Sequence, residues 1–303
     1  MTILEVFQTT PWLVVTAAAL FGLLVGSFLN VVIHRLPRML ERQWRADCAE
    51  FSGVAAPIEE KAEKINLVVP RSSCPSCGHG ITAIENIPIA SYIALGGKCS
   101  ACKAPISPRY PAVEALSGLL AGYAMWRFGP GWAALWGLIY VWTMLALAFI
   151  DQETGYLPDD LTQPLLWLGI LVSFQQPLGV DLASSVLGAV AGYLSLWIIA
   201  KAWGLIRNVE AMGHGDFKLL AAIGAWLGWK AVLGAVLISS FMGTLAGIVI
   251  MVATGQGMQA KLRFGPYLAA AGVMLLFWGA EINAALHLEE AAVELRYLFR
   301  DLF

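Results

Sequence analysis

Two aspartates lie at the ends of apolar segments. Asp151 closes the apolar run Gly131–Ile150. At the C-terminal end of a helix a negative charge opposes the macrodipole, so helix capping does not explain this residue. Asp216 follows Gly213-His-Gly and opens the run Phe217–Trp229. Two acids that meet can share a proton, one acting as a base toward water and the other as an acid. The pair is therefore suited to acid–base chemistry, provided that the two segments bring the acids together.

Other polar residues near the two aspartates have simpler explanations. Asp159 and Asp160 precede a further apolar run, and Asp at a helix start is an ordinary cap, so we expect capping there. Asp216 could cap its own helix in the same way, and this alternative stays open. Lys218 comes two positions after Asp216, so we expect its side chain to point elsewhere and to extend toward the membrane surface.

Four cysteines form two Cys-x-x-Cys pairs within one polar segment. Cys74 and Cys77 make the first pair, Cys99 and Cys102 the second, and 21 residues separate them. This is the spacing of a four-thiolate zinc site, although two disulfides are an alternative. Four thiolates fill a tetrahedral shell and leave no position for water, so we expect a structural metal. Cys48 has no partner in this pattern and is expected to be a free thiol.

The composition places the chain in a bilayer. Of its 303 residues, 58% are hydrophobic and 13% are charged, which is outside the range of ordinary soluble domains. The formal net charge of -2 supplies no basic field of the kind that binds phosphate backbones, so we expect no nucleic-acid partner.

Eight apolar runs predict an all-α polytopic membrane protein with about eight transmembrane helices. The runs are Trp12–Ile33, Ala112–Trp126, Gly131–Ile150, Leu161–Phe174, Leu182–Ile206, Phe217–Trp229, Ala231–Ala253 and Phe264–Leu286. Several are short or rich in small residues, such as Gly188–Ala200, which favours close packing between helices. The predicted domains are a first helix over 1–33, a loop domain over 34–110, a seven-helix core over 111–287 and an amphipathic tail over 288–303.

Basic residues predict the orientation of the chain. The segment His34–Tyr110 carries 10 of the 19 Lys and Arg residues, and positive charge in a loop beside a helix marks the cytoplasmic side. Counting the helices alternately from there places the loops 151–160 and 207–216 in the cytoplasm as well. Asp151 and Asp216 are then expected at the same membrane face. A cytoplasmic loop also favours zinc over disulfides, because cytosolic thiols are kept reduced.

A series of motifs along nearly the whole chain resembles the bacterial type IV prepilin peptidases, which belong to the GxGD aspartyl peptidases. In chain order the motifs are Gly26-Ser-Phe-Leu-Asn-Val-Val-Ile-His-Arg-Leu-Pro37, Pro70-Arg-Ser-Ser-Cys-Pro-Ser-Cys77, Asn86-Ile-Pro88, Arg109-Tyr-Pro-Ala-Val-Glu114, Phe149-Ile-Asp151, Leu157-Pro-Asp159, Gly213-His-Gly-Asp216-Phe-Lys-Leu-Leu and Phe264-Gly-Pro-Tyr267. The resemblance implies an enzyme of the bacterial inner membrane with its active site toward the cytoplasm.

The same resemblance implies two activities. Members of this family cleave the basic leader from prepilins of type IV pili or pseudopilins of type II secretion, and they methylate the new N-terminal amine with S-adenosylmethionine. On this resemblance Asp151 and Asp216 take the catalytic positions. Gly97 and Lys98, just before Cys99, are the candidates for binding the methyl donor, although a hairpin turn that serves the zinc site explains them equally well.

The sequence leaves open two other functions for the protein and two roles for Glu114. Asp151 and Asp216 could be relay carboxylates of a proton-coupled transporter with a zinc-stabilised cytoplasmic cap, although relay acids usually lie near the membrane midplane. The loop could instead be a docking module of a scaffold for pilus or secretion assembly. Glu114 could pair with the basic leader of a prepilin or belong to a structural ion pair.

Overall fold

A computed structural model describes residues 10–53, 65–207, 212–255 and 263–285 of the chain. The predicted tail over 288–303 lies outside the described residues. The chain forms two compact units, one ending at Pro130 and the other beginning at Gly131.

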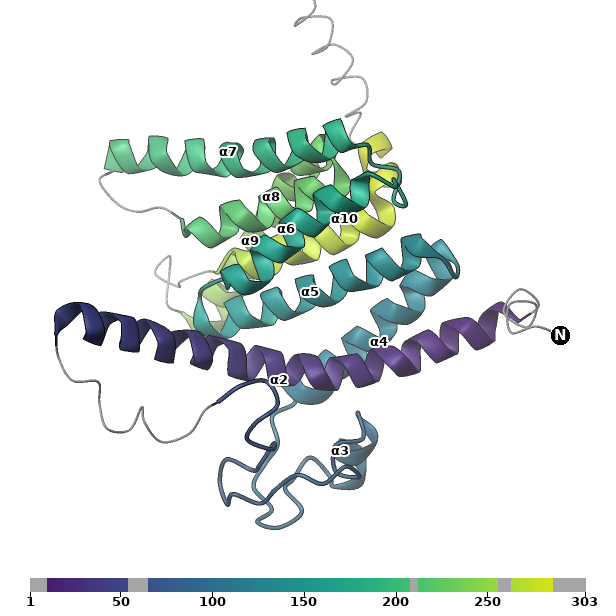
Figure 1. Ribbon diagram of the computed structural model, residues 1–303, viewed down its shortest axis with the longest axis vertical. Coiled ribbons are helices and arrows are strands. Elements are labelled where there is room, and N and C mark those ends of the chain that lie inside the picture. The colour runs from purple at the N-terminus through teal and green to yellow at the C-terminus, as the bar shows by residue number, and fades with distance from the viewer. Residues whose placement is uncertain (1–9, 54–64, 208–211, 256–262, 286–303) are drawn as a thin grey trace, which may run out of the picture. The chain divides into compact units, whose positions relative to one another are not determined.

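All eight apolar runs form helices, and a short ninth helix lies in the polar segment (Figure 1). The helices of the described residues are α2 (Pro11–Ser52), α3 (Ala90–Ala94), α4 (Arg109–Phe128), α5 (Trp132–Thr154), α6 (Asp159–Ser173), α7 (Leu182–Arg207), α8 (His214–Leu227), α9 (Trp229–Thr254) and α10 (Gly265–Ala285). The part of the chain with assigned structure contains no β-strand beyond two isolated bridges, so the all-α prediction is confirmed for it.

Five of these helices, α2, α5, α7, α9 and α10, are long and apolar enough to cross a membrane. The other three predicted spans are helical but do not meet that standard. With 15 and 14 residues, α6 and α8 are shorter than the ~20 residues that a membrane-spanning helix needs.

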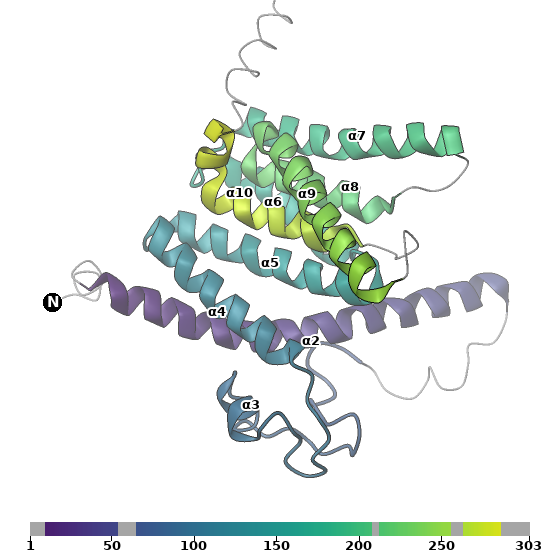
Figure 2. The same cartoon turned by 180° about the vertical axis from the view of Figure 1, so that it is seen from behind.

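In the first unit, α2 and α4 run side by side in both Figure 1 and Figure 2. Their contact is made by small residues: a Cβ on Gly22 would lie 2.6 Å from the Cβ of Ala121, and one on Gly26 would lie 2.7 Å from the Cα of Glu114. The Ser117 hydroxyl donates to the carbonyl of Gly22 at 2.5 Å. Small residues let two helix backbones approach closely and pack without a gap.

The helix α2 does not end where its apolar run ends. It continues through Pro37 to Ser52, where Gly53 adopts the left-handed conformation (φ 64°) and ends it. The segment after Ile33 is rich in Leu, Met, Glu, Arg and Gln, which are strong helix formers. The boundary predicted at residue 33 is therefore not a break in the helix.

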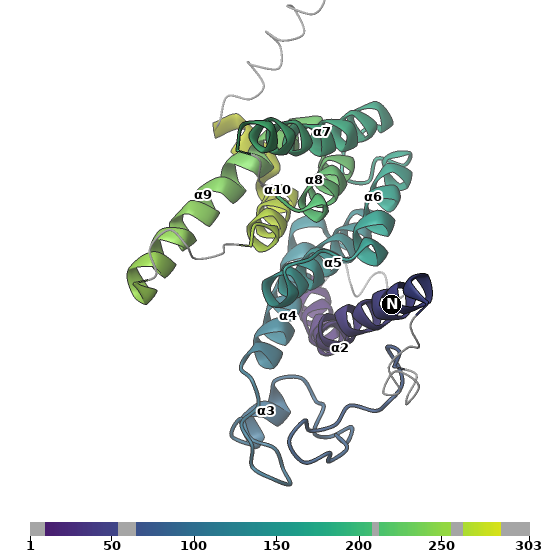
Figure 3. The same ribbon diagram turned by 90° about the vertical axis from the view of Figure 1, so that its left-hand side faces the viewer.

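In the second unit, α8 is the central helix. Every residue from Leu219 to Trp226 is buried, and Figure 3 shows α8 between α6, α7 and α10. On the α7 side, Gly188 and Gly224 bring the two backbones into contact, because a Cβ on either glycine would overlap the other residue's carbonyl group. On the α6 side, the Trp226 indole donates to the carbonyl of Leu165 at 2.7 Å. This packing fixes α8, and with it the position of Asp216.

Candidate active site

Asp151 lies in the last turn of α5. Its side chain is buried, with 5% of the residue exposed. The helix continues past it to Thr154, and the N–H of Gly155 donates to the carbonyl of Asp151 at 2.9 Å, with Gly155 in the left-handed conformation (φ 80°). Of the two carboxylate oxygens, Oδ2 is buried and has no hydrogen-bond partner among the described residues.

Two groups from the start of α10 surround Asp151. Nη1 of Arg263 donates to the carbonyl of Asp151 at 3.1 Å and also to the carbonyl of Gln152. The backbone N–H of Gly265 is directed at the Asp151 carboxylate. A Cβ on Gly265 would lie only 2.6 Å from Oδ2 of Asp151, so no other residue fits there without a shift. Arg263 directly precedes the motif Phe264-Gly-Pro-Tyr267 and was not among the predicted site residues.

Asp216 lies in the first turn of α8, which is not among the candidate spans. Burial and, second, the charge of Asp151 raise the pKa of the Asp216 carboxyl to about 7. The two acids, 65 positions apart in sequence, are thus close enough to influence each other electrostatically, as the dyad requires. The start of α8 has no side-chain capping hydrogen bond at Gly213, so capping does not account for Asp216.

Asp159 and Lys218 form an ion pair. Nζ of Lys218 lies 2.7 Å from both carboxylate oxygens of Asp159. The extension of Lys218 toward the membrane surface stays a prediction. The start of α6 has no side-chain capping bond at Pro158, so the expectation that Asp159 or Asp160 caps this helix is wrong. The ion pair instead joins the first turns of α6 and α8 near Asp216.

The four cysteines of the two pairs come together in the first unit. The Sγ atoms of Cys74, Cys77, Cys99 and Cys102 all lie within 4.8 Å of one another, and the structure joins none of them by a disulfide. Between Cys74 and Cys102 the Sγ–Sγ distance is 3.8 Å. Four thiolates about 2.3 Å from a zinc ion at tetrahedral angles are separated by about 3.8 Å. The site therefore fits a metal ion held by four thiolates.

The two cysteine pairs lie in knuckles of equivalent backbone structure. Four residues after the first cysteine of each pair, Gly78 (φ 72°) and Lys103 (φ 61°) both adopt the left-handed conformation. Each first cysteine also receives two backbone N–H groups, from Ser76 and Cys77 in the first knuckle and from Ala101 and Cys102 in the second. In the first knuckle these N–H groups lower the pKa of Cys74 to about 6. Donors aimed at sulfur favour the thiolate, which is the form that binds metal.

Comparison with known proteins identifies the family. Residues 20–128 match the model of the bacterial peptidase A24 N-terminal domain, and residues 138–248 match that of the type IV leader peptidase family. The chain belongs to the type IV leader peptidase family. This membership confirms the resemblance drawn from the motifs and leaves the transporter and scaffold alternatives without support.

Several similar proteins are named prepilin leader peptidase/N-methyltransferase. One from Aeromonas salmonicida is 48% identical over 283 residues, which cover 93% of this chain and 96% of that protein. One from Pseudomonas aeruginosa is 46% identical over 283 residues, with 93% and 97% covered. A third, from Burkholderia pseudomallei, is 48% identical over 262 residues, with 86% and 84% covered. No solved structure matches the chain.

Within this leader peptidase, the predicted methyl-donor residues lie in the second knuckle. Gly97 has a positive φ of 68°, and a Cβ there would lie 3.1 Å from the ring of Tyr92. Lys98 forms an isolated bridge with Pro105, and its side chain is exposed. The knuckle therefore explains the backbone at both positions, and a role in binding the methyl donor stays a prediction.

Glu114 is buried, with 9% of its surface exposed. Its Oε2 accepts a hydrogen bond at 2.8 Å from the backbone N–H of Ile89, a residue with a positive φ of 59°. The Ser27 hydroxyl also hydrogen-bonds to the Glu114 carboxyl. Glu114 thus fixes the polar loop to α2 and α4 through neutral partners and not through a structural ion pair, and its pairing with a basic leader stays a prediction.

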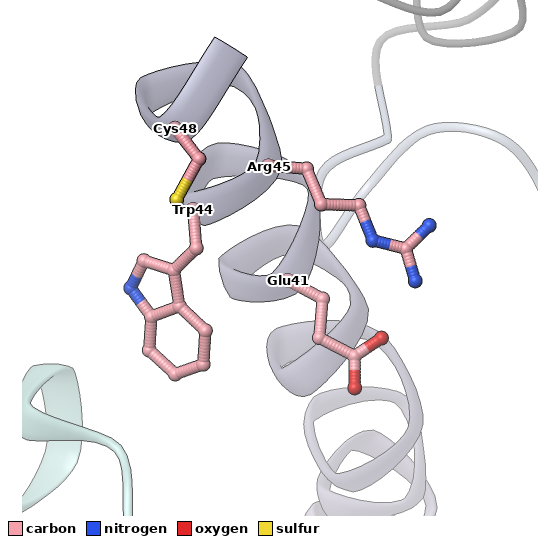
Figure 4. Close-up of a pocket in the computed structure, with 4 residues that line it drawn as sticks. All are labelled: Glu41, Trp44, Arg45 and Cys48. Atoms are coloured by element: carbon pink, nitrogen blue, oxygen red, sulfur yellow. The ribbon is translucent and has the colours of Figure 1, made fainter. Parts of the chain in front are cut away.

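Figure 4 shows a depression on the surface of α2 lined by Glu41, Trp44, Arg45 and Cys48. All four residues come from about two turns of one helix, and the depression contains none of the predicted site residues. Cys48 is an exposed free thiol, as predicted.

Proposed function

We propose that this protein cleaves the basic leader from type IV prepilins with Asp151 and Asp216 as its catalytic pair, and then methylates the N-terminal amine that cleavage exposes. The observation that best supports the catalytic pair is the electrostatic coupling of a buried acid on α5, Asp151, and a half-buried acid on α8, Asp216. A carboxyl with a pKa near neutrality beside a second carboxyl is the arrangement that acid–base hydrolysis of a peptide needs.

The cycle begins with one acid ionised and the other protonated. The ionised carboxylate takes a proton from water as the water oxygen bonds to the scissile carbonyl carbon, and the other carboxyl protonates the carbonyl oxygen. This gives a neutral gem-diol. As the C–N bond breaks, the first acid returns its proton to the departing nitrogen, and one hydroxyl of the diol returns a proton to the second acid. Both acids end in their starting states, and no covalent intermediate with the enzyme forms.

The start of α8 suits an extended substrate beside Asp216. A Cβ on Gly213 would touch nothing, so the backbone there is open to a peptide. Gly215 has a different function, because a Cβ there would lie 2.9 Å from the Cβ of Leu157. That close contact seats the first turn of α8 on the segment before α6. Gly213 therefore leaves room for the substrate backbone, whereas Gly215 lets α8 pack closely against Leu157.

Methylation requires S-adenosylmethionine, which supplies a sulfonium methyl group to the free amine. We assign Gly97 and Lys98 to its site because the exposed ammonium of Lys98 suits the carboxylate of the methionyl group. Gly97 turns the chain so that Lys98 leaves the second knuckle at its surface. The chain has no strand-based GxGxxG motif for the cofactor, so this assignment comes from the family resemblance.

The remaining proposals concern the setting of the enzyme. The four cysteines hold a structural zinc ion in a cytoplasmic loop, and the acid pair lies at the cytoplasmic face of the inner membrane. The chain is embedded in lipid through its five long apolar helices, and α4, α6 and α8 are the other three of the eight predicted membrane helices and do not all cross the bilayer. Pseudopilins of type II secretion are substrates alongside prepilins.

Purified protein incubated with a prepilin and S-adenosylmethionine tests the proposal, with the product weighed by mass spectrometry. We expect a pilin that lacks its leader and carries one added methyl group. Asp151→Asn and Asp216→Asn should each reduce cleavage at least about a hundredfold, because an amide can neither accept nor donate the proton. The double variant should be scarcely worse, since the two acids act as one unit.

Asp160→Asn is the matched control, because Asp160 is exposed in the first turn of α6 and lies outside the proposed pair. It should cleave at nearly the native rate. Near-native cleavage by correctly inserted Asp151→Asn protein would rule out the catalytic pair. A shortened but unmethylated pilin, formed with S-adenosylmethionine present, would show that the protein is a peptidase without methyltransferase activity.

A further inference from the structure

The C-terminal end of α5 places a buried acid where the helix dipole disfavours negative charge. A helix C-terminus bears a partial negative charge, so a carboxylate in its last turn is disfavoured unless positive groups surround it. Asp151 occupies that position and is buried. Thr154, the last residue of α5, is neutral, and no basic residue lies in the last turn of this helix. Any compensation therefore comes from elsewhere in the chain.

Arg263 supplies this compensation from 112 positions away in sequence. Its guanidinium donates to the carbonyls of Asp151 and Gln152, which are among the last four carbonyls of α5. It is also the positive charge that acts on the Asp151 carboxylate. One side chain therefore compensates both the helix end and the acid, and it holds the segment before α10 against α5.

The first turn of α10 adds a second favourable influence. Gly265 is the first residue of α10, and its N–H is directed at the Asp151 carboxylate. The N-terminal end of a helix carries partial positive charge and unpaired N–H groups, both of which stabilise a nearby anion. Because Gly265 has no Cβ, the backbone can come this close to Oδ2 of Asp151.

Asp216 lies in the first turn of α8 and so has the N-terminus of its own helix, but no positive charge acts on it within the described part of the chain. The charge that acts on it is that of Asp151, which is negative. The nearest lysine in sequence, Lys218, is already held by both oxygens of Asp159 at 2.7 Å. Both acids therefore have a helix N-terminus close by and are shielded from water, and the difference between them is that Asp151 alone has a cation beside it.

We infer that Arg263 and Gly265 are positioning residues that keep Asp151 as the ionised member of the pair, which makes Asp151 the base toward water and Asp216 the proton donor. The inference rests on the proposed peptidase function and assigns the roles within it. It requires Arg263 to act through charge as well as through its hydrogen bonds. The pH dependence of cleavage separates these two effects.

Other charged or titratable groups are present on the elements near the pair. These groups are Glu153 on α5, Asp159 and Asp160 on α6, His214, Asp216 and Lys218 on α8, and Tyr267 on α10. Of the positively charged groups in the described residues, Arg263 is the one whose charge acts on Asp151. Its replacement should therefore change the acidic limb of the pH profile selectively.

The test measures kcat/KM for prepilin cleavage against pH in native protein, Arg263→Gln and Arg263→Lys. In Arg263→Gln the acidic limb should move upward by about one pH unit, because a neighbouring cation commonly shifts a carboxyl by that much or more. At a fixed pH on that limb, activity falls about tenfold and recovers as the pH rises. Arg263→Lys keeps the charge and should keep the limb near its native position.

Lys230→Gln is the matched control, because it also removes one positive charge. Lys230 follows the C-terminal end of α8, whereas Asp216 lies at the other end of that 14-residue helix, roughly 20 Å away. The acidic limb of the kcat/KM profile of Lys230→Gln should lie at the same pH as that of native protein. Gly265→Ala gives a second, independent test, because the added Cβ separates the α10 amide from the carboxylate and should also move the limb upward.

The outcomes are distinguishable from those of the proposed function. If native protein cleaves prepilin and the Asp151→Asn variant does not, but neither Arg263→Gln nor Gly265→Ala moves the acidic limb, the assignment of roles is overturned and the peptidase stands. An equal loss at every pH that Arg263→Lys does not rescue would also overturn it. Failure of native protein to cleave prepilin overturns the peptidase itself.

Discussion

Among single residues, we expect Asp216, as the proposed proton donor, to set the alkaline limit of cleavage. Burial, and then the charge of Asp151, raise the pKa of Asp216 to about 7. A raised pKa keeps this acid protonated below about pH 7 and lets it ionise above, where it can no longer donate a proton. We therefore expect kcat/KM to fall about tenfold per pH unit on the alkaline side. A profile of native protein that stays flat to pH 9 would contradict this role.

Local sequence patterns predicted the acids and the cysteines, whereas long-range pairs escaped prediction. Asp151, Asp216 and the two Cys-x-x-Cys pairs each stand out from their immediate neighbours. Arg263 and Gly265 act on a residue more than 110 positions away, and a lone arginine before Phe-Gly-Pro looks like any loop cation. One signal was available, because an acid at a helix C-terminus calls for a positive partner from outside that helix.

For the helices, the contact between α7 and α8 is the one that positions Asp216. Gly224→Ala places a Cβ against the carbonyl of Gly188, where the two backbones touch. Overpacking of this kind costs about 1–3 kcal/mol, and here it also displaces the helix that carries the acid. We expect a lower melting temperature in detergent together with reduced cleavage.

Gly279→Ala is the control for that substitution. Gly279 is also a helical glycine, but a Cβ there would touch nothing within 4 Å. Alanine has the higher helix propensity, so this change should leave stability unchanged or slightly raised. Equal melting temperatures for the two variants would show that α7 and α8 can accommodate the added methyl group without loss of stability.

The apolar runs predicted every longer helix. They predicted less well where each helix ends and whether it crosses the membrane. Hydropathy detects burial without telling lipid from protein, so α8, which is buried by other helices, resembled a membrane span despite its 14 residues. At α2 the error was the opposite one, because helix propensity extends the element to Ser52 beyond the apolar residues. The division at Pro130 follows from contacts between distant segments, which composition does not show.

For the molecule as a whole, the metal site should be separable from the helices. The four ligating cysteines lie in the loop between α2 and α4, and none belongs to a helix. Cys74→Ser with Cys102→Ser should abolish metal binding and expose the loop to limited proteolysis, while the helical circular dichroism stays near native.

Metal analysis of native protein should give one zinc per chain. Cys48→Ser is the matched control, because Cys48 is exposed on α2 and outside the cluster, so its metal content should be native. Loss of most of the helical signal in the double variant would show that the loop and the helices fold as one unit. Native protein that is active but free of metal would refute a structural zinc.

The burial of α8 bears on how the cell keeps its membrane potential. Asp216 lies at the start of this helix, and below it Leu220, Ile223 and Trp226 are buried, the last against the ring of Tyr140 at 5.3 Å. A hydrolase in a bilayer needs water and exchangeable protons at its acids, which are also the ingredients of a proton leak. We expect the apolar packing around these residues to insulate the proposed site on that side, so that the enzyme passes no protons through an energised membrane.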